Sequence, residues 1–277
     1  MLNHEAISTM VAASLAEDLG DGDISAQLLP VDLTLKARII SREEAVICGI
    51  PWVNEVFKQI NPLIELQWKV QDGERVQPNQ ILVIITGLAQ SIVSAERCAL
   101  NWLQTLSATA TQTAQFVELI KTTKAKLFDT RKTMPGLRYA QKYAVRRGGG
   151  NNHRMGLYDA YLIKENHIIS CGSITAAVNL ARTKHPNRLI EIEVENLNEL
   201  QEALRVKADI VLLDNFTLEE MNEAVLLNQN QVELEVSGNV DLNTIQEIAK
   251  TGVDRISVGA LTKHVRAIDL SLRFFTD

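Results

Sequence analysis

Short apolar runs alternate with helical segments throughout the second half of the chain, and this alternation constrains the fold more than any other feature of the sequence. Strands are predicted at 126–129, 160–164, 189–195, 208–213, 232–236 and 255–258, and helices at 137–146, 173–184, 196–206, 217–229 and 241–251. Such alternation builds a parallel sheet covered by helices. Six or seven units of this kind favour an α/β barrel that is one strand short of eight. An open doubly wound sheet remains the alternative, because the sequence does not show whether the sheet closes.

The first part of the chain follows a different pattern, with one helix and several short strand-like segments. The spacing of apolar residues predicts a helix at 5–19, strands at 35–40, 45–48, 64–70 and 81–86, a long helix at 90–122 and an edge strand at 268–275. We therefore predict a small N-terminal domain with a sheet over 1–108, joined by 268–277, and a barrel domain over 109–267.

The composition is that of an ordinary globular protein, with 46% hydrophobic and 22% charged residues among 277. Its three cysteines are far apart and include no C-x-x-C pair, so neither a disulfide framework nor a structural zinc site is predicted. The start of the chain has no basic segment followed by an apolar one, and no apolar run approaches the ~18 residues that span a bilayer. We expect a cytoplasmic protein without a membrane partner. The formal net charge of −6 disfavours nucleic acid as a partner.

One stretch of this acidic chain is strongly basic. Between residues 126 and 154 a single acid, Asp129, stands among eight cations, which are Lys126, Arg131, Lys132, Arg138, Lys142, Arg146, Arg147 and Arg154. A local cationic patch on an anionic protein indicates a pocket for a small anionic ligand. For Arg138, Lys142 and Arg146, which are spaced four apart, a solvated basic helix face is an equally good interpretation.

Nearly every predicted strand ends in a residue that can contact a charged ligand. These residues are Arg131 and Lys132, Lys164, Glu193 and Glu195, Asp214, Ser237 and Gly238, and Gly259 and Ala260. Together they would line the C-terminal mouth of a barrel, where the active sites of barrel enzymes lie.

Glutamates 191, 193 and 195 share one face of their strand, with neighbours ~6.5 Å apart. Buried carboxylates need a cation such as Lys164 or Mg²⁺. An edge strand with one wet face is the alternative.

The segment Ser237-Gly238-Asn239 follows one predicted strand and precedes a helix, and Gly259 follows the next strand. Glycines at successive turns let backbone N–H groups approach a phosphate, and a helix N-terminus adds positive charge. Ordinary turn glycines are the alternative. Three further glycines, 148–150, predict a loop of unusual backbone geometry before His153 and Arg154. Cations, carboxylates and a phosphate site together suit two ligands, a polycarboxylate and a phosphate ester that carries a metal-bound pyrophosphate.

Several long motifs resemble those of the quinolinate phosphoribosyltransferase family, in the same order along essentially the whole chain. They are DTRKT at 129–133, PGLR at 135–138, GGGNNHRMGL at 148–157, KENH at 164–167, LDNF at 213–216 and VGALT at 258–262. The resemblance implies an N-terminal α/β sandwich, an open seven-stranded α/β barrel and a homodimer. It also implies the Mg²⁺-dependent reaction of quinolinate with phosphoribosyl pyrophosphate to give nicotinate mononucleotide, pyrophosphate and CO₂, a step of de novo NAD synthesis.

The resemblance assigns roles to individual residues of this sequence. It implies that quinolinate is bound by Thr130, Arg131, Lys132, His153 and Arg154, with Arg97 supplied by the other subunit. It implies phosphoribosyl contacts at Lys164, Glu193, Asp214, Ser237, Gly238, Asn239, Gly259 and Ala260, with Glu193 and Asp214 holding the metal. Lys132, Lys164, Glu193 and Asp214 are the expected catalytic residues.

Two residues depart from the family pattern, and the role of a third is not apparent from its place in the sequence. Asn239 and Ala108 stand where many members have glycine. Asparagine tolerates a left-handed backbone, which would keep the phosphate site at position 239. From its place in the sequence alone, Arg97 is interpreted as a surface residue.

Rival interpretations remain for the activity. One is a phosphate-binding aldolase in which Lys164 forms a Schiff base. Another is a relative of the same fold that acts on a different base. An arginine-rich RNA-binding protein is disfavoured by the acidic balance and by the lack of aromatic residues among the arginines.

Overall fold

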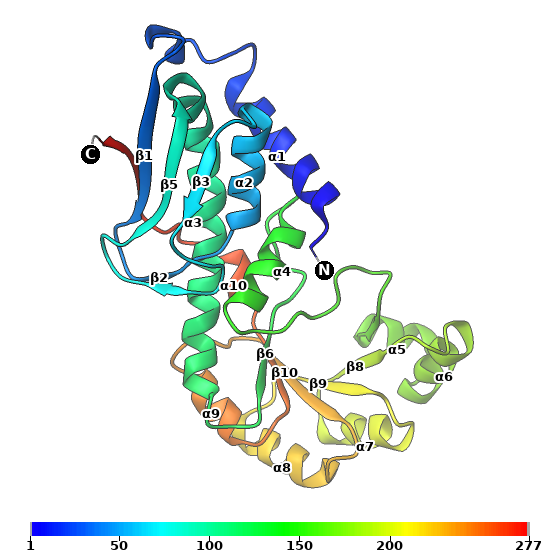
Figure 1. Cartoon of the computed structure of the whole chain (residues 1–277). Helices are drawn as coiled ribbons and strands as arrows, with labels where there is room; N and C mark the ends of the chain where they lie inside the picture. Colours follow the sequence, from blue (N-terminus) through cyan, green and yellow to red (C-terminus); the bar gives the residue numbers. More distant parts are fainter. Residues whose placement is uncertain (1, 276–277) are drawn as a thin grey trace. The chain divides into compact units, whose positions relative to one another are not determined.

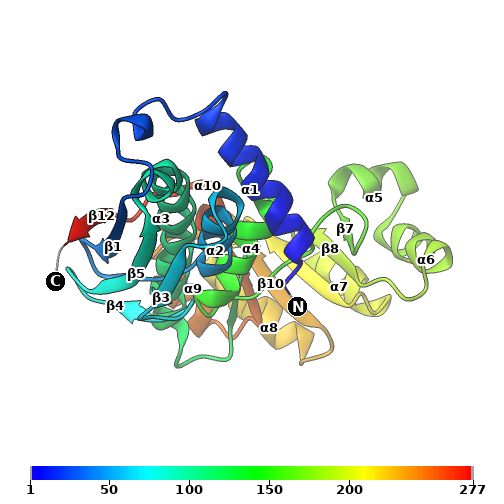
Figure 2. The same cartoon turned by 45° about the horizontal axis from the view of Figure 1, so that its top comes forward.

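The computed structural model describes residues 2–275 and divides into two compact units. The first contains the chain through Gln112, Arg147–Gly149 and the segment from His264 onward, and the second contains Thr113–Arg146 and Gly150–Lys263. Figures 1 and 2 show the elements of each unit. In the part of the chain that the structure describes, no helix has the length and apolar character needed to cross a membrane.

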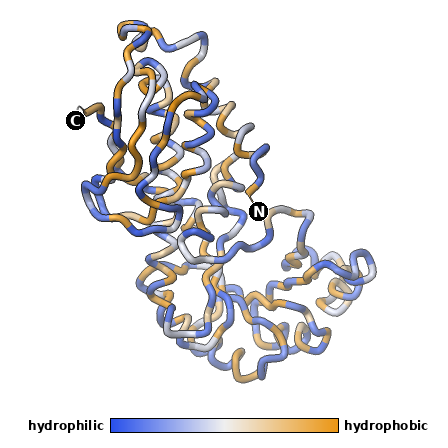
Figure 3. The backbone as a smooth tube through the Cα atoms, viewed as in Figure 1, coloured by the Kyte–Doolittle hydropathy of each residue, from blue (hydrophilic) through white to orange (hydrophobic). Residues whose placement is uncertain are grey.

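The first unit is built on an antiparallel sheet in the order β12-β1-β5-β3. Its strands are β1 (Thr34–Ser41), β3 (Glu65–Trp68), β5 (Ile81–Leu88) and β12 (Leu270–Phe275), and a two-stranded ribbon pairs β2 (Ala45–Val46) with β4 (Arg75–Val76). Apolar residues run along β5, which lies between β1 and β3 (Figure 3). The last strand, β12, pairs with β1 from Ser41↔Leu270 to Lys36↔Phe275, so the predicted edge strand at 268–275 is confirmed.

The first unit contains α1 (His4–Leu19), α2 (Ile50–Ile60) and most of α3 (Ala89–Ile120), and η1 (Ala26–Leu28) is a short 3₁₀ turn. The predicted helices at 5–19 and 90–122 are confirmed. Helix α2 was missed, because only strands were predicted in its region. It buries Trp52, Val53, Val56 and Phe57 on one face. Trp52 stacks on Trp102 of α3 with ring centroids 6.0 Å apart, which joins α2 to α3 over the sheet.

The second unit is built on a parallel sheet with the order β6-β11-β10-β9-β8-β7. Its strands are β6 (Lys126–Phe128), β7 (Tyr161–Ile163), β8 (Ile190–Val194), β9 (Ile210–Asp214), β10 (Glu233–Ser237) and β11 (Arg255–Ser257), so all six predicted strands are present. From β7 to β11 the strands follow chain order without the reversal that defines a doubly wound sheet. The sheet is therefore an open barrel. Within residues 2–275, the seventh strand that the resemblance implies is reduced to one parallel bridge between Phe128 and Asn151.

Helices follow the strands of this sheet and cover its outer side, as Figure 1 shows for α6 to α9. They are α4 (Arg138–Arg147), α5 (Glu165–Cys171), α6 (Ile174–Lys184), α7 (Leu197–Arg205), α8 (Leu218–Asn228), α9 (Ile245–Lys250) and α10 (Ala260–Lys263). Their apolar faces, such as Leu200, Ala203 and Leu204 of α7, pack on the sheet. Asn196 and Thr217 cap α7 and α8 directly after β8 and β9. These short connections leave the C-terminal ends of the parallel strands at one common edge.

Candidate active site

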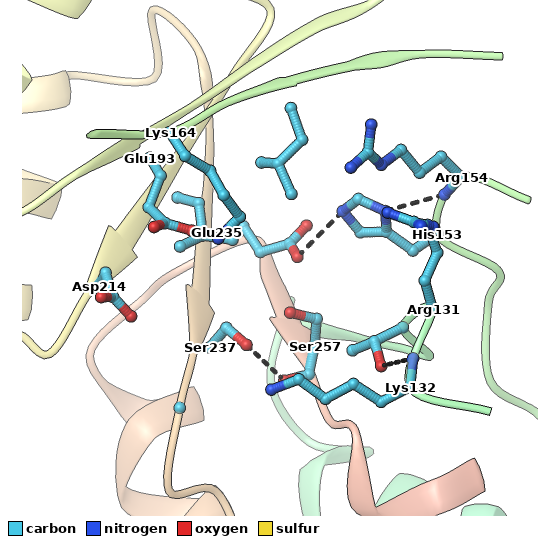
Figure 4. A pocket seen from close by; sticks show the side chains of 14 residues that line it. Arg131, Lys132, His153, Arg154, Lys164, Glu193, Asp214, Glu235, Ser237 and Ser257 are labelled. Carbon is cyan, nitrogen blue, oxygen red and sulfur yellow. Dashed lines mark hydrogen bonds and ion pairs between the residues drawn. The ribbon is translucent and has the colours of Figure 1, made fainter. Parts of the chain in front are cut away.

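A cavity of about 430 Å³ opens at this edge and is called here the mouth pocket (Figure 4). It is lined by Thr130, Arg131, Lys132, His153, Arg154, Leu162, Lys164, Glu193, Leu212, Asp214, Glu235, Ser237, Gly238 and Ser257. Ten of these residues were predicted as site residues from the sequence. Most of the predicted strand ends therefore converge on the pocket, whereas Glu195, Gly259 and Ala260 are not among its lining residues.

Thr130, Arg131 and Lys132 form one wall, directly after β6. The Lys132 N–H donates to Thr130 Oγ1 at 3.0 Å, and the Lys132 carbonyl accepts from Thr262 Oγ1 at 2.8 Å. Gly259 lies against this turn, because a Cβ there would come within 2.9 Å of Lys132 Cδ. Gly259 thus makes room for the lysine side chain, and Ala260 begins α10 beside it.

Arg154 stands beside Arg131 in the same wall. Burial lowers the pKa of Arg154, and the neighbouring charge of Arg131 lowers it further. Its Nη1 donates to the Ala160 carbonyl at 3.1 Å. Two guanidinium groups that repel one another in a partly buried wall favour binding of an anion between them.

His153 lies above a buried pair of carboxylates on the floor of the pocket. Its Nε2 is 2.7 Å from Glu191 Oε2 and 3.5 Å from Glu235 Oε1. Burial acts to lower the pKa of His153, but the hydrogen bond and charge of Glu191 outweigh it and the pKa is raised. Desolvation, followed by the charge of Glu191, raises the pKa of Glu235. The second Glu235 oxygen accepts from Arg255 Nε at 2.6 Å.

These floor residues are also a candidate metal cluster among the described residues, because ligand atoms of His153, Glu191 and Glu235 lie within 4.8 Å of one another. Arg255 already supplies positive charge there, and its guanidinium lies 3.8 Å from the centre of the Phe128 ring. We therefore interpret the cluster as a hydrogen-bonded floor for His153.

The opposite wall carries Lys164, Glu193 and Asp214. Lys164 Nζ is 2.5 Å from Glu193 Oε2. The stripe of three glutamates is divided: Glu191 is buried, Glu193 faces the pocket and Glu195 is exposed beyond the end of β8. The alternative of an edge strand is wrong, because β8 lies between β7 and β9.

Carboxylates that line a pocket without being enclosed suit Mg²⁺, which in proteins is usually held by one or two carboxylates, several waters and substrate phosphates. Glu193 and Asp214 fit that pattern.

Ser237, Gly238 and Asn239 form the turn after β10. Gly238 has φ 94° and Asn239 has φ 51°, so asparagine adopts the left-handed conformation expected of it. A Cβ on Gly238 would lie 3.8 Å from Asp214 Oδ1, which places the turn beside the acidic wall. Asn239 lies outside the mouth pocket and lines an adjoining cavity that shares Ser237 and Gly238.

The helix predicted directly after this turn begins later than expected. The regular part of helix α9 starts at Ile245, after a turn in which Asp241 Oδ1 accepts from the N–H groups of Asn243 and Thr244, as the side chain of an N-cap does. The sequence prediction that Asp241 caps a helix after this turn is confirmed, and a contribution of the helix N-terminus to the phosphate site stays a prediction. Backbone N–H groups of the turn remain available.

Two predictions concern cations outside the mouth pocket. Arg97 is exposed on α3 in the first unit, in agreement with the interpretation drawn from its place in the sequence. Lys142 is only 1% exposed and pairs with Asp129, so the solvated-face alternative for α4 is wrong at this residue. Arg138 is half-buried and donates to Thr133 Oγ1 at 3.2 Å.

Sequence reasoning missed Leu162, Leu212, Glu235 and Ser257 as lining residues. Glu235 carried a usable signal, since it is an acid within an apolar strand, two positions before Ser237 on the same face. Ser257 carried none, because serine is common at strand ends.

Fold and site together define an α/β-barrel enzyme built to hold anionic, phosphate-bearing ligands at the C-terminal edge of its sheet. Models of two family domains match nearly the whole chain: quinolinate phosphoribosyl transferase, N-terminal domain, over residues 23–107, and its C-terminal domain over 109–273. The chain therefore belongs to the quinolinate phosphoribosyl transferase family.

Named relatives agree with this assignment. The chain is 41% identical over 263 residues to a probable carboxylating nicotinate-nucleotide pyrophosphorylase of Synechocystis, covering 94% of this chain and 89% of the relative. It is 35% identical over 272 residues to the Bacillus subtilis protein of the same name, covering 98% and 94%. The solved nicotinate-nucleotide pyrophosphorylase of Francisella tularensis has a TM-score of 0.97 and 51% identity, covering 99% of this chain and 98% of that one.

Proposed function

We propose that the mouth pocket is the active site for the family's reaction. The enzyme transfers the phosphoribosyl group of phosphoribosyl pyrophosphate to quinolinate with decarboxylation, giving nicotinate mononucleotide, pyrophosphate and CO₂ in NAD biosynthesis. The observation that carries this proposal is one cavity with a cationic wall of Arg131, Lys132 and Arg154 facing an acidic wall of Glu193 and Asp214.

The cationic wall would receive quinolinate. A dianion loses its hydration on entering a pocket, and cations at both carboxylates offset that cost. Arg131 and Arg154 are forks that suit planar carboxylates, and Lys132 adds a mobile point charge. The ring nitrogen is then presented toward the acidic wall, where the sugar would lie.

The acidic wall and the turn would hold the phosphoribosyl group. Backbone N–H groups at 237–239 approach the phosphate, because Gly238 and Asn239 adopt left-handed conformations. The ring nitrogen attacks C1 of the sugar and the bond to pyrophosphate breaks. Aligning the two reactants can lower the barrier by roughly 7–11 kcal/mol. The positive ring nitrogen formed in this step stabilises the electron pair left on the neighbouring carbon when its carboxylate departs as CO₂, and that carbon then takes up a proton from water to give nicotinate mononucleotide.

We include Mg²⁺ in the proposal, held by Glu193 and Asp214 together with substrate oxygens. When bound, Mg²⁺ stabilises negative charge on the departing pyrophosphate. Lys164 would be released from Glu193 toward the substrate phosphates. A Schiff-base role for Lys164 is disfavoured, because an ion-paired, half-exposed ammonium is a poor nucleophile.

We further propose a two-fold homodimer in which Arg97 of one subunit reaches the mouth pocket of the other. The support is the family resemblance together with the exposed position of Arg97. A cytoplasmic location belongs to the same proposal and rests on the sequence alone.

Release of labelled CO₂ tests the function. With quinolinate labelled in its 2-carboxylate, we expect release only when both phosphoribosyl pyrophosphate and Mg²⁺ are present. Nicotinate offered in place of quinolinate is the substrate control. Turnover of nicotinate with none of quinolinate would contradict the assignment.

A further inference from the structure

A buried ion pair lies behind the cationic wall, and the proposed reaction has not used it. Lys142 of α4 and Asp129, directly after β6, are 1% and 0% exposed in their side chains and contact one another. Neither residue lines the mouth pocket. Both contact the segment that carries His153 and Arg154.

The contacts of this pair converge on residues 152 and 153. The His153 N–H donates to Asp129 Oδ1 at 2.9 Å, and the His153 carbonyl accepts from Lys142 Nζ at 3.0 Å. Asn152 Nδ2 donates to Asp129 Oδ2 at 2.6 Å and to the Lys142 carbonyl at 2.8 Å. Both backbone polar groups of His153 are thus held by buried charges.

Desolvation of the Asp129–Lys142 pair costs free energy, so the pair is a poor source of stability. Burial raises the pKa of Asp129 and lowers that of Lys142, and in each case the partner's charge only partly offsets this effect. Buried ion pairs can often be replaced by apolar residues without loss of stability. Stability alone therefore gives a weak reason for charges at these positions, whereas their bonds to His153 give a specific one.

We propose that Asp129, Lys142 and Asn152 are positioning residues, which fix the backbone at His153 and so set where His153 and Arg154 meet the carboxylates of quinolinate. This inference rests on the proposed function. Loss of these positioning contacts should therefore weaken the binding of quinolinate and leave the binding of phosphoribosyl pyrophosphate unchanged. The acidic wall is held by other contacts, the Lys164–Glu193 pair and the turn after β10.

Asn152→Ala is the first test, because it removes two hydrogen bonds to the pair without unbalancing its charge. Asn228→Ala is the matched control. Asn228 is 3% exposed and also makes two hydrogen bonds, to the N–H and carbonyl of Val232, at the opposite end of β10. We expect Asn152→Ala to raise KM for quinolinate by about tenfold or more, since misplacement by ~1 Å can cost ~10² in rate. KM for phosphoribosyl pyrophosphate should stay within about twofold of wild type, and Asn228→Ala should change neither KM.

The double variant Asp129→Asn with Lys142→Met is the second test. It removes both buried charges together, so no uncompensated charge remains to unfold the protein. We expect the same selective rise in KM for quinolinate with a melting temperature close to that of Asn228→Ala.

The positioning role would be overturned if the two KM values changed equally. It would also be overturned if the KM for quinolinate stayed at the wild-type value in both tests. Failure of the wild type to use quinolinate would overturn the proposed function instead, and the wild-type assay reports that separately.

Discussion

At the scale of single residues, one wall of the mouth pocket gathers the cations Arg131, Lys132 and Arg154, whereas the opposite wall pairs Lys164 with Glu193 beside Asp214. Arg154 is partly buried beside Arg131, and its lowered pKa reflects burial and that neighbouring charge. Such an arrangement is unfavourable until an anion enters. Binding of a dicarboxylate therefore relieves an electrostatic cost that the free protein carries.

Lys132→Ala and Arg154→Ala should each lower kcat/KM for quinolinate by ~10² or more, because a desolvated carboxylate then lacks a charged partner. Lys126→Ala is the matched control, an exposed lysine at the start of β6. Steady-state assays with thermal unfolding curves provide the measurement. Wild-type turnover in either pocket variant, with normal unfolding, would refute the role of that residue.

Glu193→Gln and Asp214→Asn should each raise the Mg²⁺ concentration needed for half-maximal rate, because amide oxygens are weaker ligands for a hard cation than carboxylates. Glu223→Gln, on an exposed position of α8, controls for the loss of one negative charge. Titration of Mg²⁺ at saturating substrate gives the result. Identical curves for both pocket variants and the control would leave the two acids with a purely structural role.

The site residues that could be predicted from the sequence are those whose place at the end of a strand also fixes where they lie in the barrel. A charged residue at the C-terminal end of a parallel strand or shortly after it, such as Lys132, Lys164 or Asp214, lies at the common edge. Residues within strands or on helices point either inward or outward, and alternation alone does not decide which. Glu235 and Lys142 were misjudged for this reason, since their burial depends on partners brought in by other elements.

At the scale of elements, strands and long helices were predictable because their apolar periodicity is sustained. Helix α2 was not recognised, although Gly49 followed by Pro51 in the first turn is a helix-start signal. The regular part of α9 follows a turn capped by Asp241, whose side chain accepts from two backbone N–H groups that have no partner within a helix. Apolar periodicity carries no information on where such a capped turn ends and the regular helix begins.

One loop of the first unit is held by a carboxylate that should make stability depend on pH. Asp23 accepts from the N–H groups of Ala26 and Ser25 and from Ser94 Oγ at 2.9 to 3.0 Å. The Ala26 bond, then the Ser94 bond, lowers its pKa below the ordinary 3.8. A lowered pKa stabilises the folded state fully above 3.8, and that contribution is lost as the pH falls through the folded value.

Asp23→Asn should therefore be less stable than wild type at neutral pH, and the difference should shrink as the pH falls below 3.8. Urea unfolding between neutral pH and pH ~3 measures it. Asp21→Asn, two residues earlier and exposed, is the control. A difference between Asp23→Asn and wild type that stays constant with pH would mean that the ionised form of Asp23 has no special role.

At the scale of the whole molecule, neither unit is a single stretch of sequence. Helix α3 contributes residues to both units, and the chain returns from Lys263 to the first unit, where β12 completes the sheet. The strand order of the second unit shows a barrel that the sequence could only favour, because closure depends on β6 joining β11 across more than one hundred residues. The family resemblance supplied what periodicity could not, the assignment of chemistry to this barrel.

The proposed assembly gives the last prediction, for Arg97 and Lys164. Each of Arg97→Ala and Lys164→Ala should be inactive as a homodimer, but a mixture should regain activity. In a mixed dimer, one site carries both changes and the other carries neither, provided that Arg97 acts across the interface. Random exchange makes roughly half of the dimers mixed, with one intact site each, so recovery should approach roughly a quarter of wild-type activity.

Mixing Lys132→Ala with Lys164→Ala is the control for this experiment. Both residues line the pocket of the same chain, so every site in their mixed dimer carries one change and no activity should return. Subunit exchange is verified with differently tagged chains in both mixtures. If the Arg97 mixture then regains no more activity than the control, Arg97 does not act in the partner's pocket, and its exposure on α3 reflects an ordinary surface residue.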